Sequence, residues 1–152
     1  MPIEYRSGDA SDPRETRPLI IVHCCNNEGG WGRGFVLALS QRWPDPEREY
    51  RRWHQGGELP LGQVQFVEVG PQVWVANLIG QDGVRHRGGT PPVRYPAIRK
   101  GLQRVAVFAR EVGATVQMPR MGAGLAGGYW PFIEGIIQDE LKDLPVVVYD
   151  LV

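Results

Sequence analysis

The sequence predicts a single α/β domain in which helices cover both faces of a mixed central sheet, a three-layer α/β/α arrangement. Two β-like runs open the chain, a hairpin-like pair of strands follows, and the last third alternates between helical and β-like segments. With 152 residues, of which 42% are hydrophobic, the chain is long enough to bury its own core. We therefore treat residues 1–152 as one domain.

The first half of the chain begins with two strands. Residues 3–6 form a short β-like run, and the continuous apolar run over 18–25 is typical of a strand buried on both faces. Apolar residues on one helical face predict a helix over 34–43, which Pro44 ends. Residues 45–55 are rich in charge and predict an exposed helix.

The second half begins with a hairpin, whose strands are expected over 62–69 and 72–80. Apolar residues at near-helical spacing predict a helix over 95–113, with Gly113 as its C-cap. A strand, a helix and a final strand complete the chain, over 114–118, 130–141 and 145–152, respectively.

Composition narrows the classes of partner. Seventeen basic and 17 acidic residues give a net charge of +0, so no nucleic-acid partner is expected. The only two cysteines, Cys24 and Cys25, are adjacent, which disfavours a disulfide and offers no zinc spacing. Neither a metal nor a cofactor is expected. A polar N-terminus without a membrane-length apolar run predicts a cytoplasmic protein with no membrane partner.

Two glycine-rich segments, 26–35 and 118–130, each follow a predicted strand and open a predicted helix. Backbone amides and the positive end of a helix favour an anion there, and glycine allows the backbone to approach it closely. Neither segment matches a P-loop or a dinucleotide fingerprint, which disfavours a nucleotide triphosphatase or a hydride-transfer enzyme. Each alone also fits an ordinary tight turn, but two at equivalent junctions favour a diphosphate clamped between them.

Three further residues suit a nucleotide ligand, each with a purely structural alternative. Asp9 follows the first strand and could accept a hydrogen bond from an exocyclic amine, or form a helix cap or Asx-turn. Asn26 could bond a sugar hydroxyl, or shape a turn. Tyr149 could stack on a base, or belong to the core.

Six segments in this order carry a resemblance to a known family. They are "SGDASDP", "VHCCNNEGGWGRGF", "VANLIGQDG", "RYPAIRKGL", "MPRMGAGLAGGYW" and "VVVYDL", and they span nearly the whole chain. The sequence resembles the macrodomains, which bind ADP-ribose. It is most similar to the branch that includes the terminal ADP-ribose protein glycohydrolase and the ADP-ribose-1''-phosphate phosphatases.

This resemblance implies a macrodomain fold with a cleft for ADP-ribose or a mono-ADP-ribosylated protein. Asp9 and the amide of Ala10 would meet the adenine, Tyr149 would flank it, and Asn26 would lie beside the distal ribose. Arg120 would brace the second loop. The two phosphate loops would consist of Gly32, Arg33 and Gly34, and of Gly122, Ala123, Gly124 and Leu125.

The sequence departs from the glycohydrolase pattern at two positions. The resemblance implies that the glycohydrolase of this branch uses a lysine after the strand expected over 72–80 and an aspartate inside the second loop. This sequence has Gln81 at the lysine position and Ala126 at the aspartate position. A lysine adduct is therefore excluded. We expect slow hydrolysis of ADP-ribosyl-glutamate, ADP-ribosyl-aspartate or O-acetyl-ADP-ribose, with His86 and Gln81 as candidate catalytic residues, although His86 also fits a merely solvated loop histidine. The alternatives are a non-catalytic ADP-ribose reader and an ADP-ribose-1''-phosphate phosphatase.

Overall fold

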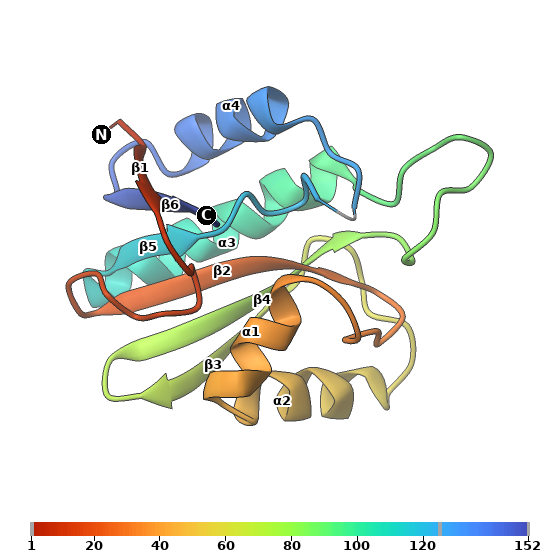
Figure 1. The fold of residues 1–152 in the computed structure, drawn as a ribbon, viewed down its shortest axis with the longest axis horizontal. Helices are drawn as coiled ribbons and strands as arrows, with labels where there is room; N and C mark the ends of the chain where they lie inside the picture. The colour runs from red at the N-terminus through yellow and green to blue at the C-terminus, as the bar shows by residue number, and fades with distance from the viewer. Residues whose placement is uncertain (1, 125, 152) are drawn as a thin grey trace.

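A computed structural model, which describes residues 2–124 and 126–151, contains a six-stranded sheet between two layers of helices (Figure 1). This confirms the predicted three-layer class. The strands are β1 Glu4–Ser7, β2 Leu19–Asn26, β3 Val64–Gly70, β4 Val73–Gln81, β5 Thr115–Met118 and β6 Val146–Asp150. The helices are α1 Phe35–Arg42, α2 Asp45–His54, α3 Tyr95–Val112 and α4 Trp130–Glu140.

The sheet has the strand order β1-β6-β5-β2-β4-β3, in which only β3 runs antiparallel to its neighbour. The sheet is therefore mixed, as predicted. Because the other five strands are parallel, the segments that follow β2, β4 and β5 leave the sheet at the same edge. In open α/β sheets this edge is where ligands bind.

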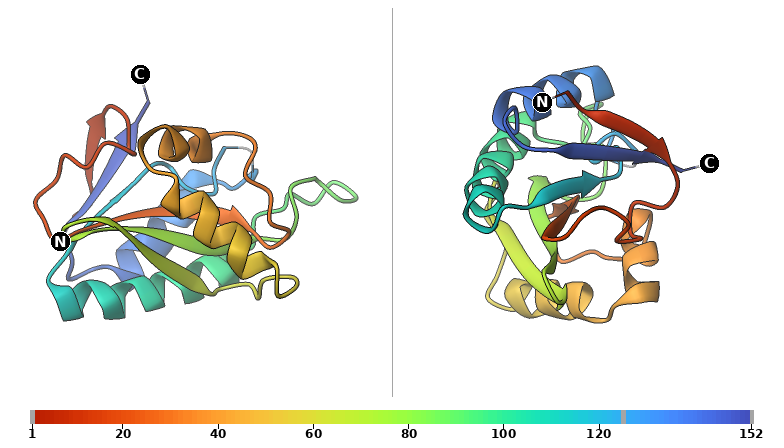
Figure 2. Two further views of the ribbon diagram at one scale, coloured as in Figure 1. Left: turned by 90° about the horizontal axis from the view of Figure 1, so that it is seen from below. Right: turned by 90° about the vertical axis from the view of Figure 1, so that its left-hand side faces the viewer.

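Helices α1 and α2 cover one face of the sheet, and α3 and α4 cover the other (Figures 1 and 2). Strand β2 alternates between the two cores. Ile20 and Val22 pack in the cluster of α3 and α4, whereas Leu19 and Ile21 pack in the cluster of α1 and α2. All four side chains are fully buried, so the prediction of a strand buried on both faces is confirmed.

Helix α2 corrects one expectation, because this charge-rich helix is not exposed all round. Tyr50 is fully buried, and its hydroxyl donates a hydrogen bond of 2.5 Å to the carbonyl oxygen of Asn26. Pro46 is buried as well. The charged residues occupy the outer side, so a polar composition concealed a narrow apolar stripe.

Helix α3 ends as predicted. Gly113 adopts φ = 72°, in the left-handed region, and its amide donates to the carbonyl oxygen of Ala109.

Within the described parts of the chain, no helix combines the length and the apolar character that crossing a bilayer requires.

Candidate functional site

A cleft of about 820 Å³ opens at the carboxyl edge of the parallel strands. The end of β2, the glycine-rich segment after it and the start of α1 form one wall. The segments that follow β4 and β5 form the others. Of the sequence-predicted site residues, the cleft brings together Asn26, Gly32, Arg33, Gly34, Gln81, His86, Gly122 and Gly124.

Asn26 organises the first glycine-rich loop. Its Oδ1 accepts hydrogen bonds from the amides of Glu28 and Gly30, at 2.9 and 3.0 Å, and its Nδ2 donates to the carbonyl oxygen of Gly30. The turn-shaping alternative for Asn26 is thus realised. Asn26 also lines the cleft, and its contact with a ribose stays a prediction.

The first loop leads directly into the N-terminus of α1. Gly34, at φ = 81°, precedes the helix, no side chain of the described residues caps it, and the first turn contains no acidic residue. Gly34, Phe35 and Val36 all line the cleft. Amides in an uncapped first turn, together with the helix dipole, favour an anion at this wall.

The second glycine-rich loop closes on itself. The amide of Gly128 donates to the carbonyl oxygen of Gly122 at 2.8 Å, and the amide of Gly127 donates to that of Gly124 at 3.0 Å. Gly122 has φ = 77°, which a larger residue would adopt only with strain. Gly122 and Gly124 line the cleft, whereas Ala123 does not, and Leu125 lies outside the described residues.

Three arginines line the cleft, and two of them have no ion-pair partner among the described residues. Arg33, Arg85 and Arg120 contribute to its walls, and none of the described lining residues is Asp or Glu. Arg120 pairs with both carboxylate oxygens of Asp150 and lies over the ring of Trp130, as a bracing residue would. Within 2–124 and 126–151, Arg33 and Arg85 have no ion-pair partner.

The two candidate catalytic residues lie on the loop side of the cleft. The Nε2 of Gln81 donates to the carbonyl oxygen of Gly83 at 3.0 Å, so this side chain is held in place. His86 is exposed, and its ring lies close to Gly127 of the second loop. The methyl group of Ala126 also lines the cleft, at the position where an acid was expected from the related glycohydrolase.

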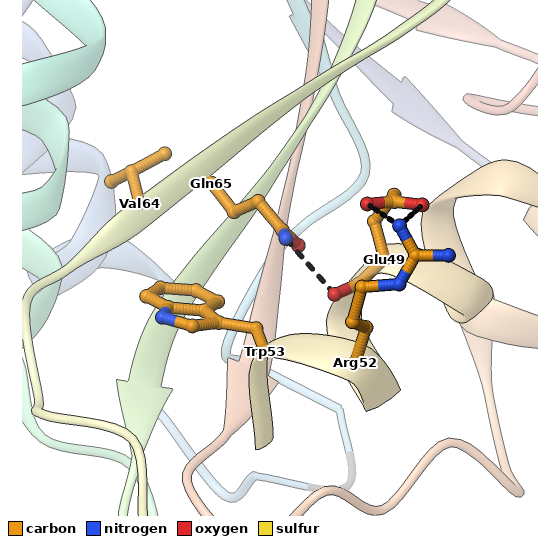
Figure 3. A pocket seen from close by; sticks show the side chains of 5 residues that line it. All are labelled: Glu49, Arg52, Trp53, Val64 and Gln65. Carbon is orange, nitrogen blue, oxygen red and sulfur yellow. Dashed lines mark hydrogen bonds and ion pairs between the residues drawn. The ribbon is translucent and has the colours of Figure 1, made fainter. Parts of the chain in front are cut away.

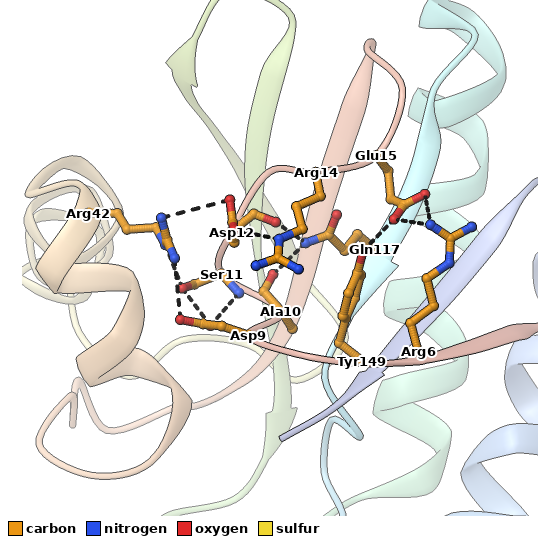
Figure 4. A network of polar contacts seen from close by, with 10 residues as sticks. All are labelled: Arg6, Asp9, Ala10, Ser11, Asp12, Arg14, Glu15, Arg42, Gln117 and Tyr149. Carbon is orange, nitrogen blue, oxygen red and sulfur yellow. Dashed lines mark hydrogen bonds and ion pairs between the residues drawn. The ribbon is translucent and has the colours of Figure 1, made fainter. Parts of the chain in front are cut away.

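The residues predicted to hold adenine, whose polar contacts Figure 4 shows, are not among the residues that line the cleft. Asp9 forms an Asx-turn: its Oδ1 accepts from the amide and the hydroxyl of Ser11, at 2.8 and 2.7 Å. Partial burial acts to raise the pKa of Asp9, but the bonds from Ser11 and Arg42 outweigh it and lower the pKa. Asp9 therefore stays ionised at neutral pH.

Tyr149 belongs to the core, which was the structural alternative for it. Its side chain is buried with Ala10 and Val147, and its hydroxyl donates to Glu15. Phe35 packs against this small cluster and also lines the cleft. Phe35 is therefore the residue that links Ala10 and Tyr149 to the cleft. The contacts of Asp9, Ala10 and Tyr149 with adenine stay predictions.

Comparison with known proteins identifies the family. A solved structure of a macrodomain protein from Streptomyces coelicolor is 50% identical in sequence, has a TM-score of 0.86, and covers 97% of this chain and 98% of its own. This chain is a macrodomain. A solved structure of a protein of unknown function from Bacteroides thetaiotaomicron is also 50% identical, with a TM-score of 0.96 and 99% of both chains covered. No family model matches the sequence.

Curated relatives of this macrodomain are more distant. An ADP-ribose 1''-phosphate phosphatase from Candida albicans is 26% identical over 162 residues, which cover 97% of this chain and 98% of the relative. A DNA ADP-ribosyl glycohydrolase from Mycobacterium tuberculosis is 27% identical over 146 residues, 95% of this chain and 40% of the relative. The mouse Chromodomain-helicase-DNA-binding protein 1-like is 29% identical over 159 residues, and this chain spans only 17% of its length.

Three titratable residues that line the macrodomain cleft were not predicted as site residues from the sequence: His23, Cys24 and Cys25. Burial lowers the pKa of His23 to about 4 and raises the pKa of Cys24 to about 12; burial also raises the pKa of the Cys25 thiol. At neutral pH the imidazole is uncharged and both thiols keep their protons, so neither cysteine is an activated nucleophile. Their place at the end of a buried strand was the signal that they would reach this edge.

Asn77 fixes the tautomer of His23. The Nδ2 of Asn77 donates to the carbonyl oxygen of Pro46 and to the Oε1 of Gln65, so its Oδ1 must be the atom that faces His23. The His23 Nε2 lies 2.6 Å from that oxygen and therefore carries the proton. The uncharged His23 ring therefore donates a hydrogen bond through Nε2, and this nitrogen cannot act as a base.

A second hollow, of about 300 Å³, lies between α2 and β3 (Figure 3). Its polar groups bond one another: Arg52 pairs with Glu49, and Gln65 donates to the carbonyl oxygen of Glu49 at 3.0 Å. Trp53 and Val64 complete its lining. Since these polar groups already have partners, this hollow offers no chemistry comparable to that of the cleft.

Proposed function

We propose that this macrodomain binds ADP-ribose and hydrolyses mono-ADP-ribosyl esters, with ADP-ribosyl-glutamate, ADP-ribosyl-aspartate or O-acetyl-ADP-ribose as substrates. The observation that carries the proposal is the cleft, in which two glycine-rich loops and the uncapped start of α1 meet unpaired arginines and no described carboxylate. This lining suits a ligand with two phosphates. Two curated relatives named for ADP-ribose derivatives support the same ligand.

The residues present restrict the mechanism. Gln81 has no amine and cannot form a Schiff base, and the methyl group of Ala126 cannot act as an acid or base. An ester at the anomeric carbon of ADP-ribose is intrinsically labile. A water that the cleft holds close to this carbon, beside the substrate's own diphosphate, is therefore sufficient for slow hydrolysis. Water adds across the ester bond and releases ADP-ribose and a carboxylic acid. We propose His86, which lines the cleft, as the residue that assists proton transfer.

Release of ADP-ribose from a glutamate-linked ADP-ribosylated protein tests this function directly. We expect slow release that is lost in a variant unable to bind ADP-ribose, and no covalent adduct on addition of cyanoborohydride. Binding of ADP-ribose without release, beside an active glycohydrolase as positive control, would refute hydrolysis. A covalent adduct between the protein and ADP-ribose, trapped by cyanoborohydride, would instead refute the proposal that no lysine takes part.

A non-catalytic reader is the second candidate, and the pair Gln81 and Ala126 favours it. Micromolar or tighter binding of ADP-ribose in calorimetry, with no turnover of any ester, would establish it. Phosphatase activity is favoured by the relative from Candida albicans, 98% of which this chain covers. Release of inorganic phosphate from ADP-ribose-1''-phosphate separates that activity from ester hydrolysis.

The attached macromolecule is proposed to be a protein, since the formal charge of +0 gives no general attraction to a polyanion. The relative named DNA ADP-ribosyl glycohydrolase makes ADP-ribosylated DNA the appropriate competing substrate. Both substrates should be offered at equal concentration and at two salt concentrations. Faster release from DNA would overturn the protein assignment but leave the ADP-ribose site in place.

A further inference from the structure

Gln117 joins the centre of the sheet to the loop that carries the predicted adenine contacts. It lies on β5, it is fully buried, and its Nε2 donates to the carbonyl oxygens of Ala10 and Asp12, each at 2.7 Å (Figure 4). These contacts connect residues more than one hundred positions apart in the sequence. One side-chain amide thus holds both sides of the turn formed by residues 9–12.

The orientation of this amide is determined by its partners. Two carbonyl oxygens can only accept, so the NH₂ group of Gln117 must face them and its Oε1 must point away. That Oε1 is buried and has no hydrogen-bond partner in the described part of the protein. A buried acceptor without a partner is destabilising, and a methionine or leucine would fill the same space without this cost. The position therefore retains a polar side chain for the two bonds that its NH₂ group makes.

The turn held by Gln117 presents Asp9 to solvent. The Asp9 side chain is 40% exposed, its Oδ1 is engaged by Ser11, and its Oδ2 lies 3.4 Å from a nitrogen of Arg42. A carboxylate has more acceptor positions than these bonds occupy, so Oδ2 can still accept from an exocyclic amine. Ser11 and Arg42 set the rotation of the carboxylate, while Gln117 sets the backbone that carries it.

We propose that Gln117 is a positioning residue that determines selectivity for adenine, by holding Asp9 and Ala10 where an exocyclic amine and a ring nitrogen would meet them. This inference rests on the proposed function, because it takes ADP-ribose as the ligand. It assigns base recognition to a residue that does not touch the base. Loss of the two bonds should therefore weaken recognition of adenine without affecting the diphosphate-binding loops.

The test compares two ligands that differ in the base. ADP-ribose has the exocyclic amine, and its hypoxanthine counterpart, inosine diphosphate ribose, lacks it. We expect the Gln117→Met variant, which fills the space but donates nothing, to lose about tenfold in affinity for ADP-ribose, the equivalent of one charge-assisted hydrogen bond. Affinity for inosine diphosphate ribose should change by less than about twofold, well under the value of one hydrogen bond.

The Gln117→Glu variant provides a second readout. Its carboxylate cannot donate and would repel the two carbonyl oxygens of Ala10 and Asp12, so this variant should also lose the preference for adenine. Gln138→Glu is the matched control, because Gln138 is exposed on α4 and does not line the cleft. An unchanged ratio of the two affinities in Gln117→Met would overturn the inference, as would an equal loss for both ligands. If the wild-type protein binds neither ligand, the proposed function itself is wrong, and that outcome is distinct.

Discussion

At the scale of single residues, Gly124 illustrates how the cleft depends on a missing side chain. It lines the cleft, and a Cβ added to it would meet no atom within 4 Å among the described residues outside its two chain neighbours. A larger side chain there would therefore disturb the ligand site and leave the protein's own packing intact. Gly122 differs, because its added Cβ would lie 3.1 Å from the Cδ1 of Ile98, and its φ of 77° adds strain.

We predict that Gly124→Glu lowers the affinity for ADP-ribose by at least about tenfold, because the carboxylate would occupy the phosphate position and repel it. The melting temperature without ligand should stay within a few degrees of the wild type. Gly135→Glu on α4 is the matched control, since its added Cβ also meets nothing within 4 Å and it lies outside the cleft. Calorimetry that finds unchanged affinity in Gly124→Glu would place the diphosphate elsewhere.

His23 makes the stability of the fold depend on pH. Its pKa is lowered from 6.5 to about 4 because burial disfavours the charged ring. A group with a depressed pKa in the folded state binds its proton more readily when unfolded. The free-energy contribution of the uncharged His23 ring is therefore complete above pH 6.5. It is lost as the pH falls toward 4, because the unfolded chain takes up the proton first. The shift corresponds to about 3 kcal/mol.

We predict that the free energy of unfolding falls by an amount of this order between pH 6.5 and pH 4, as measured by urea denaturation. Other titrating groups change over the same range, so the wild type must be compared with His23→Gln, which does not titrate. The variant should be less stable at pH 7 and should show a shallower slope. Parallel slopes for the two proteins would contradict the assignment.

At the scale of elements, helix α3 approaches β4 closely because Gly101 has no side chain. An added Cβ would lie 2.4 Å from the Cγ of Leu78, a fully buried residue on β4. Glycine inside a helix normally costs about 1 kcal/mol relative to alanine. Here close packing of the helix on the sheet offsets that cost.

Gly101→Ala should therefore destabilise the protein by about 2 kcal/mol, since overpacking outweighs the gain in helix propensity. The opposite sign is expected for Gly135→Ala, which adds a methyl group in open space on α4 and should stabilise by about 0.5 kcal/mol. Urea denaturation of both variants checks this pair. If both changes stabilised the protein, helix propensity and not packing would control both positions.

At the scale of the whole molecule, the cleft concentrates positive charge on a chain with a net charge of +0. Arg33 comes from the loop after β2, and Arg85 from the loop after β4. These two walls are brought together by the parallel pairing of β2 with β4. The attraction for an anionic ligand is therefore a property of the fold and would not arise from either loop alone.

We predict that Arg85→Gln weakens ADP-ribose binding about tenfold at low salt, and that the difference narrows at high salt because exposed charges are screened. Arg48→Gln on α2, an exposed arginine outside the cleft, should leave the affinity unchanged. Calorimetry at two ionic strengths is the measurement. A loss that does not depend on salt would indicate that Arg85 shapes the loop, with no electrostatic contribution.

Local signals in the sequence determined where the elements begin and end. Hydrophobic patterning, the charge of residues 45–55, Pro44 and Gly113 predicted the six strands and four helices of the described residues to within two residues at each end. Such signals are local because they depend on neighbours in the chain. Composition alone was misleading for α2, since its buried Tyr50 is recognised only once the helix lies on the sheet.

The two glycine-rich loops that line the cleft were predictable for the same reason, since glycines after a strand and before a helix mark both of them. Only the tertiary structure placed His23, Cys24 and Cys25 at its base, Asp9 beside it, and Gln117 beneath the turn of Asp9. These placements depend on strand order and on contacts between residues far apart in the chain. Burial then set the pKa values, because the dielectric surroundings of a side chain are a property of the packed fold.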